Sequence, residues 1–373
     1  MSDIADLSKG IGISKDQLSA DGEPCILYGE LYTKYKSETI KEVISKTNID
    51  NTKLVKSKAN DVIIPCSGET AEEIATARCV LKDDVLLGGD LNIIRLHGYD
   101  GSFMSYQLNG KRKYDIAKVA QGVSVVHLYG EHLKNIKTIN PGLNEQKKIA
   151  NLLSLLDERI STQNKIIEKL ESLIKGICNN YFLKLSHSQE MKSIRLGDIL
   201  KERNEYCCKD GTFVHGTLSK DGLFPKTERW NRDFLVKEEN KKYKITHLDD
   251  ICYNPANLKF GVICRNIYGD LIFSPIYVTF EVSKKVNIGF IELYLTNRNF
   301  IEKIRKFEQG TVYERMSVSP EDFLSYKIRI PSLSEQTFFY QKIQRLKNCS
   351  QNELEHLNLY RKLRQYLLRQ MFI

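Results

Sequence analysis

Two copies of one short motif divide this chain: Pro141-Gly142-Leu143-Asn144-Glu145-Gln146 and, 190 residues later, Pro331-Ser332-Leu333-Ser334-Glu335-Gln336. The same offset continues without a gap to the end of the chain, where it pairs Phe182 with Phe372. The regions that precede the two motifs look different from each other. The sequence therefore predicts an internal repeat in which a variable region and a shared segment alternate twice.

The shared segment after Pro141 is expected to form a long helix. No proline occurs from residue 142 to residue 224, and Asn144 suits the N-cap position, with Glu145 near the positive end of the helix. Apolar residues then recur in alternating steps of four and three, a spacing typical of a coiled-coil seam. Gln163 interrupts this seam, as a polar residue that sets the register of a coiled coil does.

The second shared segment keeps most of this apolar stripe, although Ser350, Glu353 and Arg364 break it. Such a helix needs a partner for its apolar face, and the simplest partner for each copy is the other copy. The alternative is that each helix packs on its own globular half. The expected seam residues are Ile149, Leu153, Leu156, Ile160, Ile167, Leu170, Ile174, Ile177, Ile343, Leu346, Leu357 and Leu367.

The predicted fold class is therefore α+β. Two mixed α/β globular domains are separated by two long helices that form an antiparallel coiled coil, with a pseudo-twofold internal repeat. The expected segments are a first globular domain at 1–140, a first spacer helix at 141–186, a second globular domain at 187–330 and a second helix at 331–373. A helix of about 40 residues would be ~60 Å long at 1.5 Å per residue.

The variable regions combine short apolar runs with turn signals such as Gly88-Gly89-Asp90, a pattern typical of strands. Helices are expected at 69–78 and 293–307. The expected strands are 62–65, 85–87, 93–94, 123–126, 251–253, 261–264, 271–273 and 276–282.

The composition excludes several classes of protein. The chain has 373 residues, 41% of them apolar, and 56 Lys and Arg against 47 Asp and Glu, which is an ordinary globular mix and not that of a disordered chain. No apolar run approaches the ~18–20 residues that a membrane span needs, and the N-terminus lacks a signal sequence. The nine cysteines have no C-x-x-C spacing. We therefore expect reduced thiols, a cytoplasmic location and no zinc site.

Motifs of catalysis are missing from the sequence. It contains no P-loop, no G-x-S-x-G and no H-E-x-x-H, and the seven histidines show no metal-ligand spacing. Asn254-Pro255-Ala256-Asn257 resembles the N-P-P-aromatic loop of amino-methyltransferases but lacks the aromatic residue. No catalytic residue and no metal are therefore expected on this chain.

Aromatic and basic residues interleave in two stretches, around residues 28–36 and 226–232. Such stretches suit DNA, because Arg and Lys bind phosphates or guanine, Asn binds adenine, and aromatic rings pack on sugars and bases. An equally weighted alternative is a pair of surface loops whose aromatic rings are anchored in the core. The candidate DNA contacts are Lys15, Tyr28, Tyr32, Lys34, Tyr35, Lys220, Lys226, Arg229, Trp230, Asn231 and Arg232.

Two unlike globular regions, each followed by P-x-L-x-E-Q and a long helix, resemble the specificity subunit of type I restriction–modification enzymes. The resemblance covers essentially the whole chain. It is carried by residues 141–150 and 155–160, by the run on to Tyr181-Phe182, and by the stretches 13–16 and 28–32. The second copy departs from the pattern, because Thr337-Phe338-Phe339-Tyr340 replaces the usual basic-Ile-Ala stretch.

The resemblance implies that each globular region is a target-recognition domain that reads half of a bipartite, asymmetric site in the major groove of double-stranded DNA. The helices would set the gap between the half-sites and dock two methyltransferase subunits, which methylate adenine at N6. Motor-nuclease subunits would complete the complex. No cofactor is implied for this chain, and S-adenosylmethionine, ATP and Mg²⁺ are expected on the partner subunits. No membrane partner is expected.

Three alternatives stay open at this point. One is a specificity subunit of a related system whose partner fuses nuclease and methylase. Another is a coiled-coil scaffold that binds proteins instead of DNA, which site-specific and salt-dependent duplex binding would argue against. The third is a diverged nuclease or methylase that acts without partners.

Overall fold

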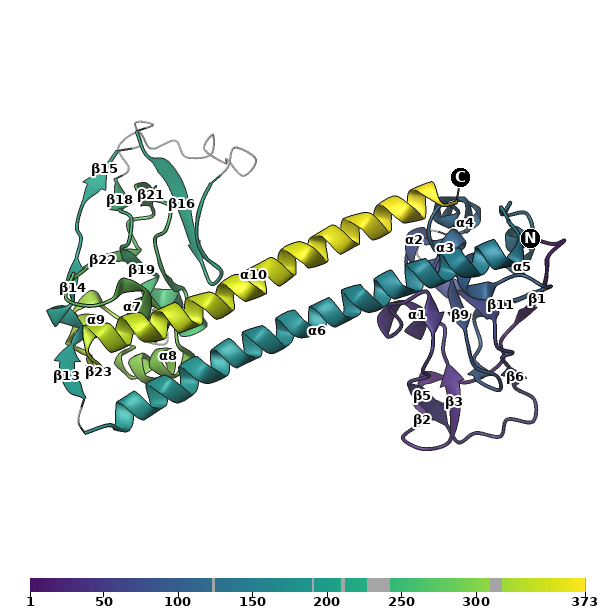
Figure 1. Cartoon of the computed structure of the whole chain (residues 1–373), viewed down its shortest axis with the longest axis horizontal. Coiled ribbons are helices and arrows are strands. Elements are labelled where there is room, and N and C mark those ends of the chain that lie inside the picture. The colour runs from purple at the N-terminus through teal and green to yellow at the C-terminus, as the bar shows by residue number, and fades with distance from the viewer. Residues whose placement is uncertain (123–124, 190, 209–211, 227–241, 309–316, 373) are drawn as a thin grey trace. The chain divides into compact units, whose positions relative to one another are not determined.

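The computed structural model describes residues 1–122, 125–189, 191–208, 212–226, 242–308 and 317–372 (Figure 1). The chain divides into two compact units. Unit 1 contains Met1–Ile166 and Glu353–Ile373, and unit 2 contains Ile167–Asn352. Within the described ranges, no helix is both long enough and apolar enough to cross a membrane.

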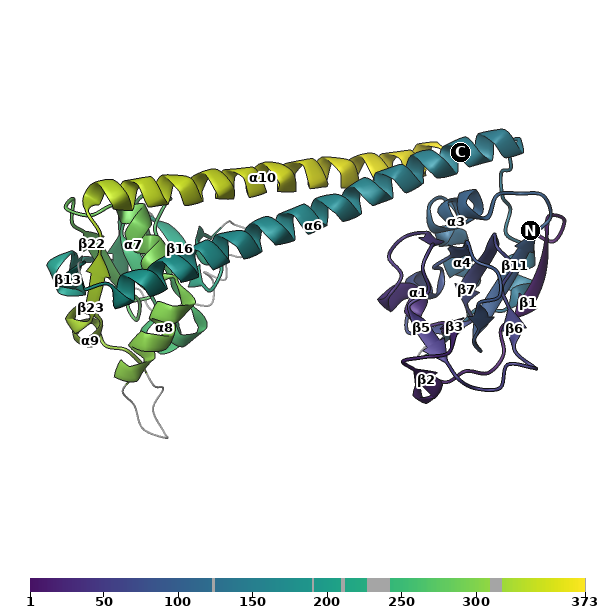
Figure 2. The ribbon, with the colours of Figure 1, turned by 60° about the horizontal axis from the view of Figure 1, so that its bottom comes forward.

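Unit 1 is built on two five-stranded sheets (Figure 2). The first has the order β1-β11-β7-β9-β4 and the second the order β2-β5-β3-β10-β6. The strands are β1 Ala5–Lys9, β2 Leu18–Ser19, β3 Glu23–Ile26, β4 Thr39–Ile40, β5 Ser45–Thr47, β6 Val55–Lys56, β7 Asp61–Pro65, β8 Ser67–Gly68, β9 Arg78–Val80, β10 Leu86–Leu87, β11 Leu91–Leu96 and β12 Val126–His127. The short helices are α1 Glu30–Thr33, α2 Ala71–Ile74, α3 Gly101–Asn109, α4 Lys113–Val119 and α5 Gly130–Lys134, with a 3-10 turn at Lys15–Gln17.

Unit 2 has a four-stranded sheet, β14-β22-β19-β20, and a five-stranded sheet, β15-β18-β21-β16-β17, while β13 pairs with β23. The strands are β13 Lys192–Arg195, β14 Leu200–Glu202, β15 Tyr206–Cys207, β16 Val214–Ser219, β17 Gly222–Pro225, β18 Tyr243–Thr246, β19 Ile251–Tyr253, β20 Ile263–Arg265, β21 Leu271–Phe273, β22 Val278–Val282 and β23 Lys327–Ile330. The short helices are α7 Ile288–Leu295, α8 Arg298–Ile304 and α9 Pro320–Ser325, with 3-10 turns at Leu196–Asp198, Pro255–Phe260 and Arg305–Phe307.

The two units repeat one topology although their sequences differ. The run β1-β11-β7-β9 is antiparallel throughout, as is β14-β22-β19-β20. In the second sheets, β10 is parallel to β3 and antiparallel to β6, and β21 is likewise parallel to β16 and antiparallel to β18. The internal repeat therefore extends from the helices into the variable regions.

Most of the expected strands lie at or near observed ones, with boundary shifts of a few residues. The expected strand 123–126 is only partly covered, since residues 123–124 lie outside the described ranges and β12 begins at Val126. The helix expected at 69–78 is wrong in extent, because α2 covers only Ala71–Ile74 and Arg78 already belongs to β9. The helix expected at 293–307 is two helices, α7 and α8, which Asn297 separates as the N-cap of α8.

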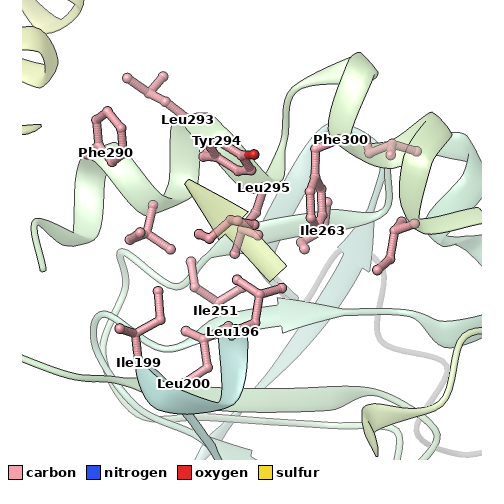
Figure 3. Packing of buried hydrophobic residues seen from close by; sticks show 14 of the residues in the cluster. Leu196, Ile199, Leu200, Ile251, Ile263, Phe290, Leu293, Tyr294, Leu295 and Phe300 are labelled. Atoms are coloured by element: carbon pink, nitrogen blue, oxygen red, sulfur yellow. The ribbon is translucent and has the colours of Figure 1, made fainter. Parts of the chain in front are cut away.

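The core of unit 2 packs aliphatic and aromatic residues of the sheet against those of α7 and α8 (Figure 3). Leu196, Ile251 and Ile263 pack with Phe290 and Leu295 from α7 in one buried cluster. This cluster takes in residues of both long helices. Each globular region therefore buries helix ends as part of its own core.

The two long helices are α6, Leu143–His187, and α10, Leu333–Gln370. In unit 1 they run antiparallel, because Asp157 binds Arg364 while Gln163, further along α6, binds Glu353, earlier on α10. All twelve expected seam residues are buried or half-buried. The predicted antiparallel coiled coil is confirmed.

Gln163, the polar residue that interrupts the seam, is hydrogen-bonded to the other long helix. Gln163 is 1% exposed, and its amide group donates to the backbone carbonyl and to the carboxylate of Glu353. Glu353 occupies the position of the second repeat that corresponds to Gln163 in the first. The helices therefore cross at equivalent positions of the repeat, which agrees with a polar residue that sets the register.

The glutamine of the repeated motif explains why the motif occurs before both helices. Gln146 accepts a hydrogen bond from the Asp100 backbone N–H at 2.9 Å and donates to the Pro141 carbonyl at 2.6 Å. In unit 2, Gln336 accepts from the Asn287 N–H and donates to the Pro331 carbonyl, both at 2.9 Å. Asp100 and Asn287 are the N-cap residues of α3 and α7. The motif therefore ties each long helix to the first turn of a helix in its globular region.

Candidate functional site

A surface pocket of about 810 Å³ lies in unit 1. It is lined on one side by the segment from Gly12 to Leu18 and on the other by the segment from Leu27 to Lys34, which follows β3. Gly89 and Asp90 complete it. Four of the sequence-predicted contacts, Lys15, Tyr28, Tyr32 and Lys34, line this one pocket.

Helix α1 carries Tyr32, and Tyr28 lies just before it. Tyr28 is half-buried against the cluster of Ile26, Leu31 and Ile63, so its ring is held by the core. Tyr32 is 37% exposed, and burial, together with the nearby Tyr28 and Glu73, raises the pKa of its phenol. Two aromatic rings with polar tips therefore line the same pocket, which suits stacking on a base or sugar.

The two lysines of the pocket differ in their surroundings. Lys34 donates to Glu30 at 2.6 Å and to the Ser45 hydroxyl at 2.7 Å. Glu30 is buried and also accepts from the Leu27 backbone N–H, so this lysine is oriented by the fold. Lys15 is exposed in the 3-10 turn and is the more available of the two for a phosphate.

Tyr35 is a correction to the predicted set. It is only 7% exposed, its ring packs in the cluster with Leu31 and Ile40, and its hydroxyl accepts a hydrogen bond from the Ile44 backbone N–H. Its backbone carbonyl accepts from the buried guanidinium of Arg78. Tyr35 is therefore a core residue, in line with the alternative that aromatic rings of this stretch are anchored in the core.

Close backbone contact forms the floor of the pocket. The Gly89 N–H donates to the Gly12 carbonyl at 2.6 Å. A Cβ on Gly10 would lie 2.0 Å from the Gly88 carbonyl oxygen, so no larger residue fits there without movement. The glycines thus hold the loop before β2 against the loop before β11.

In unit 2, the candidate residues lie on and after the β16–β17 hairpin. Lys220 is exposed in the turn between these strands, and Lys226 is exposed just after β17, where its backbone N–H donates to the His215 carbonyl at 2.7 Å. Two exposed aromatic rings that were not predicted, Phe224 and Tyr268, lie 6.4 Å apart between centroids. Phe224 is two residues from Lys226, so the aromatic–basic alternation was readable in the sequence.

The remaining predicted contacts, Arg229, Trp230, Asn231 and Arg232, lie outside the described residues. The two described sets share a place in the topology. Residues 27–34 follow β3, which is parallel to β10, and Lys220 follows β16, which is parallel to β21. Both sets therefore extend from equivalent strands of the repeated fold.

Unit 1 carries a second aromatic and basic patch that sequence reasoning missed. The Lys9 ammonium group lies 5.3 Å from the centroid of Tyr129, whose ring stacks on His127 and meets His132 edge-on. Because strand pairing and chain reversal bring residue 9 to residue 129, no local pattern signals this patch. Burial raises the pKa of the Cys66 thiol, a shift that Lys9 opposes and that Asp90, a residue of the pocket, reinforces.

In chemical terms, these sites offer cations, amide and hydroxyl groups and exposed aromatic rings. Within the described ranges, no group of three or more His, Cys, Asp or Glu side chains could hold a metal ion. The arrangement suits recognition of a polyanion with bases, because cations meet phosphates and aromatic and polar side chains meet bases.

Comparison with known proteins gives consistent results. Residues 1–172 match the family model described as the type I restriction modification DNA specificity domain. The chain is similar to the type I restriction enzyme MjaVIII specificity subunit of Methanocaldococcus jannaschii, with 24% identity over 371 residues, covering 92% of this chain and 85% of that protein.

Two solved structures have a similar fold. One is the S subunit of a type I restriction-modification system from M. genitalium, with 18% identity and a TM-score of 0.61, covering 100% of this chain and 94% of that one. The other is a chain from a structure of the complex assembly and conformational transition of the type I restriction-modification system. It has 12% identity and a TM-score of 0.56, covering 98% of this chain and 95% of that one.

Proposed function

We propose that this chain is a type I restriction–modification DNA specificity subunit, as the family model over residues 1–172 and the similar relative support, and that each of its two units reads one half of a bipartite DNA site. The chain recognises DNA sequence and does not itself catalyse methylation or cleavage. The observation that carries the proposal is that four of the five predicted contacts of unit 1 line one pocket. In unit 2, Lys220 follows the equivalent strand, β16, and Lys226 follows β17, which pairs with β16.

Unit 1 and unit 2 would read different half-sites. Their frameworks repeat, but the side chains on the equivalent segments differ, with Tyr28, Tyr32 and Lys15 in unit 1 against Lys220 and Phe224 in unit 2. Base readout depends on the donor and acceptor pattern of such side chains. The complete site would therefore be asymmetric.

The long helices would set the number of base pairs between the half-sites. Helix α6 has 45 residues and α10 has 38, which correspond to about 68 Å and 57 Å of helix at 1.5 Å per residue. Both helices contribute one end to each unit.

The catalytic steps would belong to partner subunits that act in the cytoplasm. We propose two methyltransferase subunits, which bring S-adenosylmethionine and methylate adenine at N6, and motor-nuclease subunits, which bring ATP and Mg²⁺. Exposed apolar residues on the long helices, including Leu152, Leu155, Leu173, Leu359 and Leu363, support docking of a partner there.

The test is co-expression with the candidate methyltransferase in a host without DNA methylation, followed by mapping of N6-methyladenine by single-molecule sequencing. A bipartite motif with a fixed spacer, dependent on this chain, is expected. Lys15→Ala with Tyr32→Ala should relax one half of the motif only, and Lys220→Ala with Lys226→Ala should affect the other half only. A lost base contact costs ~1–3 kcal/mol of discrimination.

The matched control is Tyr114→Ala with Lys118→Ala, an aromatic–basic pair of unit 1 that does not line the pocket. This control should leave the motif unchanged. A stable complex whose methylation pattern is identical for all three double variants would refute the assignment of these residues. Stable partner binding with no salt-dependent duplex binding would instead favour a protein-binding scaffold.

A further inference from the structure

A buried ionic network in unit 1 joins the last part of α10 to α6 and to the globular region. The Arg364 guanidinium binds Asp157 of α6 at 2.5 Å and both carboxylate oxygens of Glu38 at 2.6 Å. Asp157 also accepts a hydrogen bond from the Tyr106 hydroxyl of α3 at 2.7 Å. The Arg364 guanidinium of α10 thus binds two carboxylates, Asp157 of α6 and Glu38 of the globular region.

The two carboxylates depend on this cation. Glu38 is 5% exposed, and although burial raises its pKa, Arg364 and the nearby Arg78 outweigh burial and hold the pKa below its ordinary range. Burial and the adjacent Glu38 raise the pKa of Asp157. A helix that entered this place without a cation would leave two carboxylates together in a buried site, which is strongly unfavourable.

The repeat shows which helix lacks the cation. At the fixed offset of 190 residues, Arg364 of the second helix corresponds to Ile174 of the first. At the neighbouring seam positions both helices carry apolar residues, such as Leu357 and Ile167 or Leu367 and Ile177. Along the seam, the two helix ends therefore differ in charge at two positions, Glu353 against Gln163 and Arg364 against Ile174, and only Arg364 places a cation there.

Unit 2 shows the opposite arrangement. Ile174 packs against the apolar core there, and Lys347 occupies the position that corresponds to Asp157. A helix that brought arginine to the place of Ile174 would meet an apolar core and a lysine instead of a carboxylate. The charges of each unit therefore complement one of the two helix ends and do not complement the other.

We propose that Glu38, Asp157 and Arg364 form a selective lock in unit 1. Through this lock, unit 1 binds the end of the second long helix in preference to the corresponding stretch of the first. The competitor that the lock excludes is the first helix of a second copy of this chain. Without it, two first halves could pair through their repeated seams and form a symmetric assembly. This inference concerns helix pairing and does not depend on DNA recognition.

The test is a graft within the full-length chain, in which residues 353–372 are replaced by the sequence of residues 163–182. The repeat aligns these segments without a gap, so the graft keeps the apolar seam and removes the cation at position 364. Amide hydrogen exchange in α3 and in residues 35–40 should accelerate on the order of a hundredfold, while exchange in the sheets of unit 2 stays unchanged. Restoring arginine at position 364 of the graft should recover most of the protection.

The matched control restores arginine at position 361 of the graft instead. Arg361 is an exposed residue of the native helix that contacts Asn164 at 3.3 Å. The graft carries glutamate at position 361, from Glu171, so this control is one charge more positive than the restored graft. It places the added charge outside the lock, so protection should stay low. Native protection in the unmodified graft, or equal recovery with arginine at 361 and 364, would overturn the proposal.

Single substitutions decide the question if the graft unfolds both units. Arg364→Ile should accelerate exchange in unit 1 strongly, and Arg361→Ile should change it by less than about threefold. Adding Glu38→Gln and Asp157→Asn to Arg364→Ile should recover part of the protection, because these amides need no cation. Equal effects of Arg364→Ile and Arg361→Ile, or no recovery in the triple variant, would overturn the lock.

Discussion

Replacing Gln146 with leucine should loosen the attachment of α6 to unit 1. Leucine has a similar size, so the substitution removes two hydrogen bonds with little change in packing. Gln146 is 1% exposed, and the two groups that it binds are the Asp100 N–H and the Pro141 carbonyl. Water has little access to this site, so both groups would stay without a partner.

The magnitude follows from the two lost bonds. Leaving a buried donor or acceptor without a partner costs ~1–3 kcal/mol each. Part of this cost is recovered because leucine is apolar and because the Pro141 end can move toward solvent. We therefore expect a loss of about 2–4 kcal/mol in the free energy that protects the α3–α6 junction.

Native-state hydrogen exchange measures this loss locally. Gln146→Leu should reduce protection in α3 and in the first turns of α6, whereas Gln336→Leu should do the same in α7 and the first turns of α10. Each variant is the control for the other, and Glu145→Gln at an exposed neighbour should change nothing. A loss below about 0.5 kcal/mol for Gln146→Leu would refute the role assigned to the motif, and so would a change that appears in both units equally.

Two further predictions concern the seam and a charged cluster of unit 2. Leu153→Ala should destabilise unit 1 by ~2–5 kcal/mol because Leu153 is fully buried. Leu155 is 55% exposed, so Leu155→Ala should change the stability by less than about 0.5 kcal/mol. Chemical denaturation followed by hydrogen exchange measures both changes. Burial lowers the pKa of His247, but hydrogen bonds to Asp270 and Glu205 outweigh burial and raise it above 6.5. Because the pKa of His247 is higher in the folded state, its protonation stabilises the fold fully at pH values below the unfolded-state pKa. This stabilisation, below ~1 kcal/mol for a partly exposed ring, should be lost as the pH rises through the folded-state pKa. His247→Gln should abolish this pH dependence of stability.

Much of the fold could be predicted because it follows from local periodicity. The 3.5-residue spacing from Ile149 onward predicts a helix with one apolar face, and the two copies at a fixed offset predict a pair. Short buried strands such as β7 and β19 could be found as β-branched or aromatic runs. Helix α3 was missed, because it is buried on nearly all sides and shows no single apolar stripe.

Residues whose role depends on distant partners could not be assigned in this way. Tyr35 and Tyr32 belong to the same aromatic–basic stretch, but one is core and the other faces a pocket, a difference decided by the strands around them. Lys9 and Tyr129 meet only because the chain returns after 120 residues. Glu38 gives no local signal of its dependence on Arg364.

Arg364 shows most clearly how the two kinds of information differ. In the sequence it is a break in an apolar stripe, and in the structure it is the cation that two buried carboxylates require. The sequence alone determined the repeat, the two helices, their seam and the family resemblance, since these depend on residue spacing along one segment. Only the tertiary structure decided that the variable regions share a topology, which side chains face the pocket, and which helix end each unit accepts. Those properties depend on contacts between residues that lie far apart in the chain.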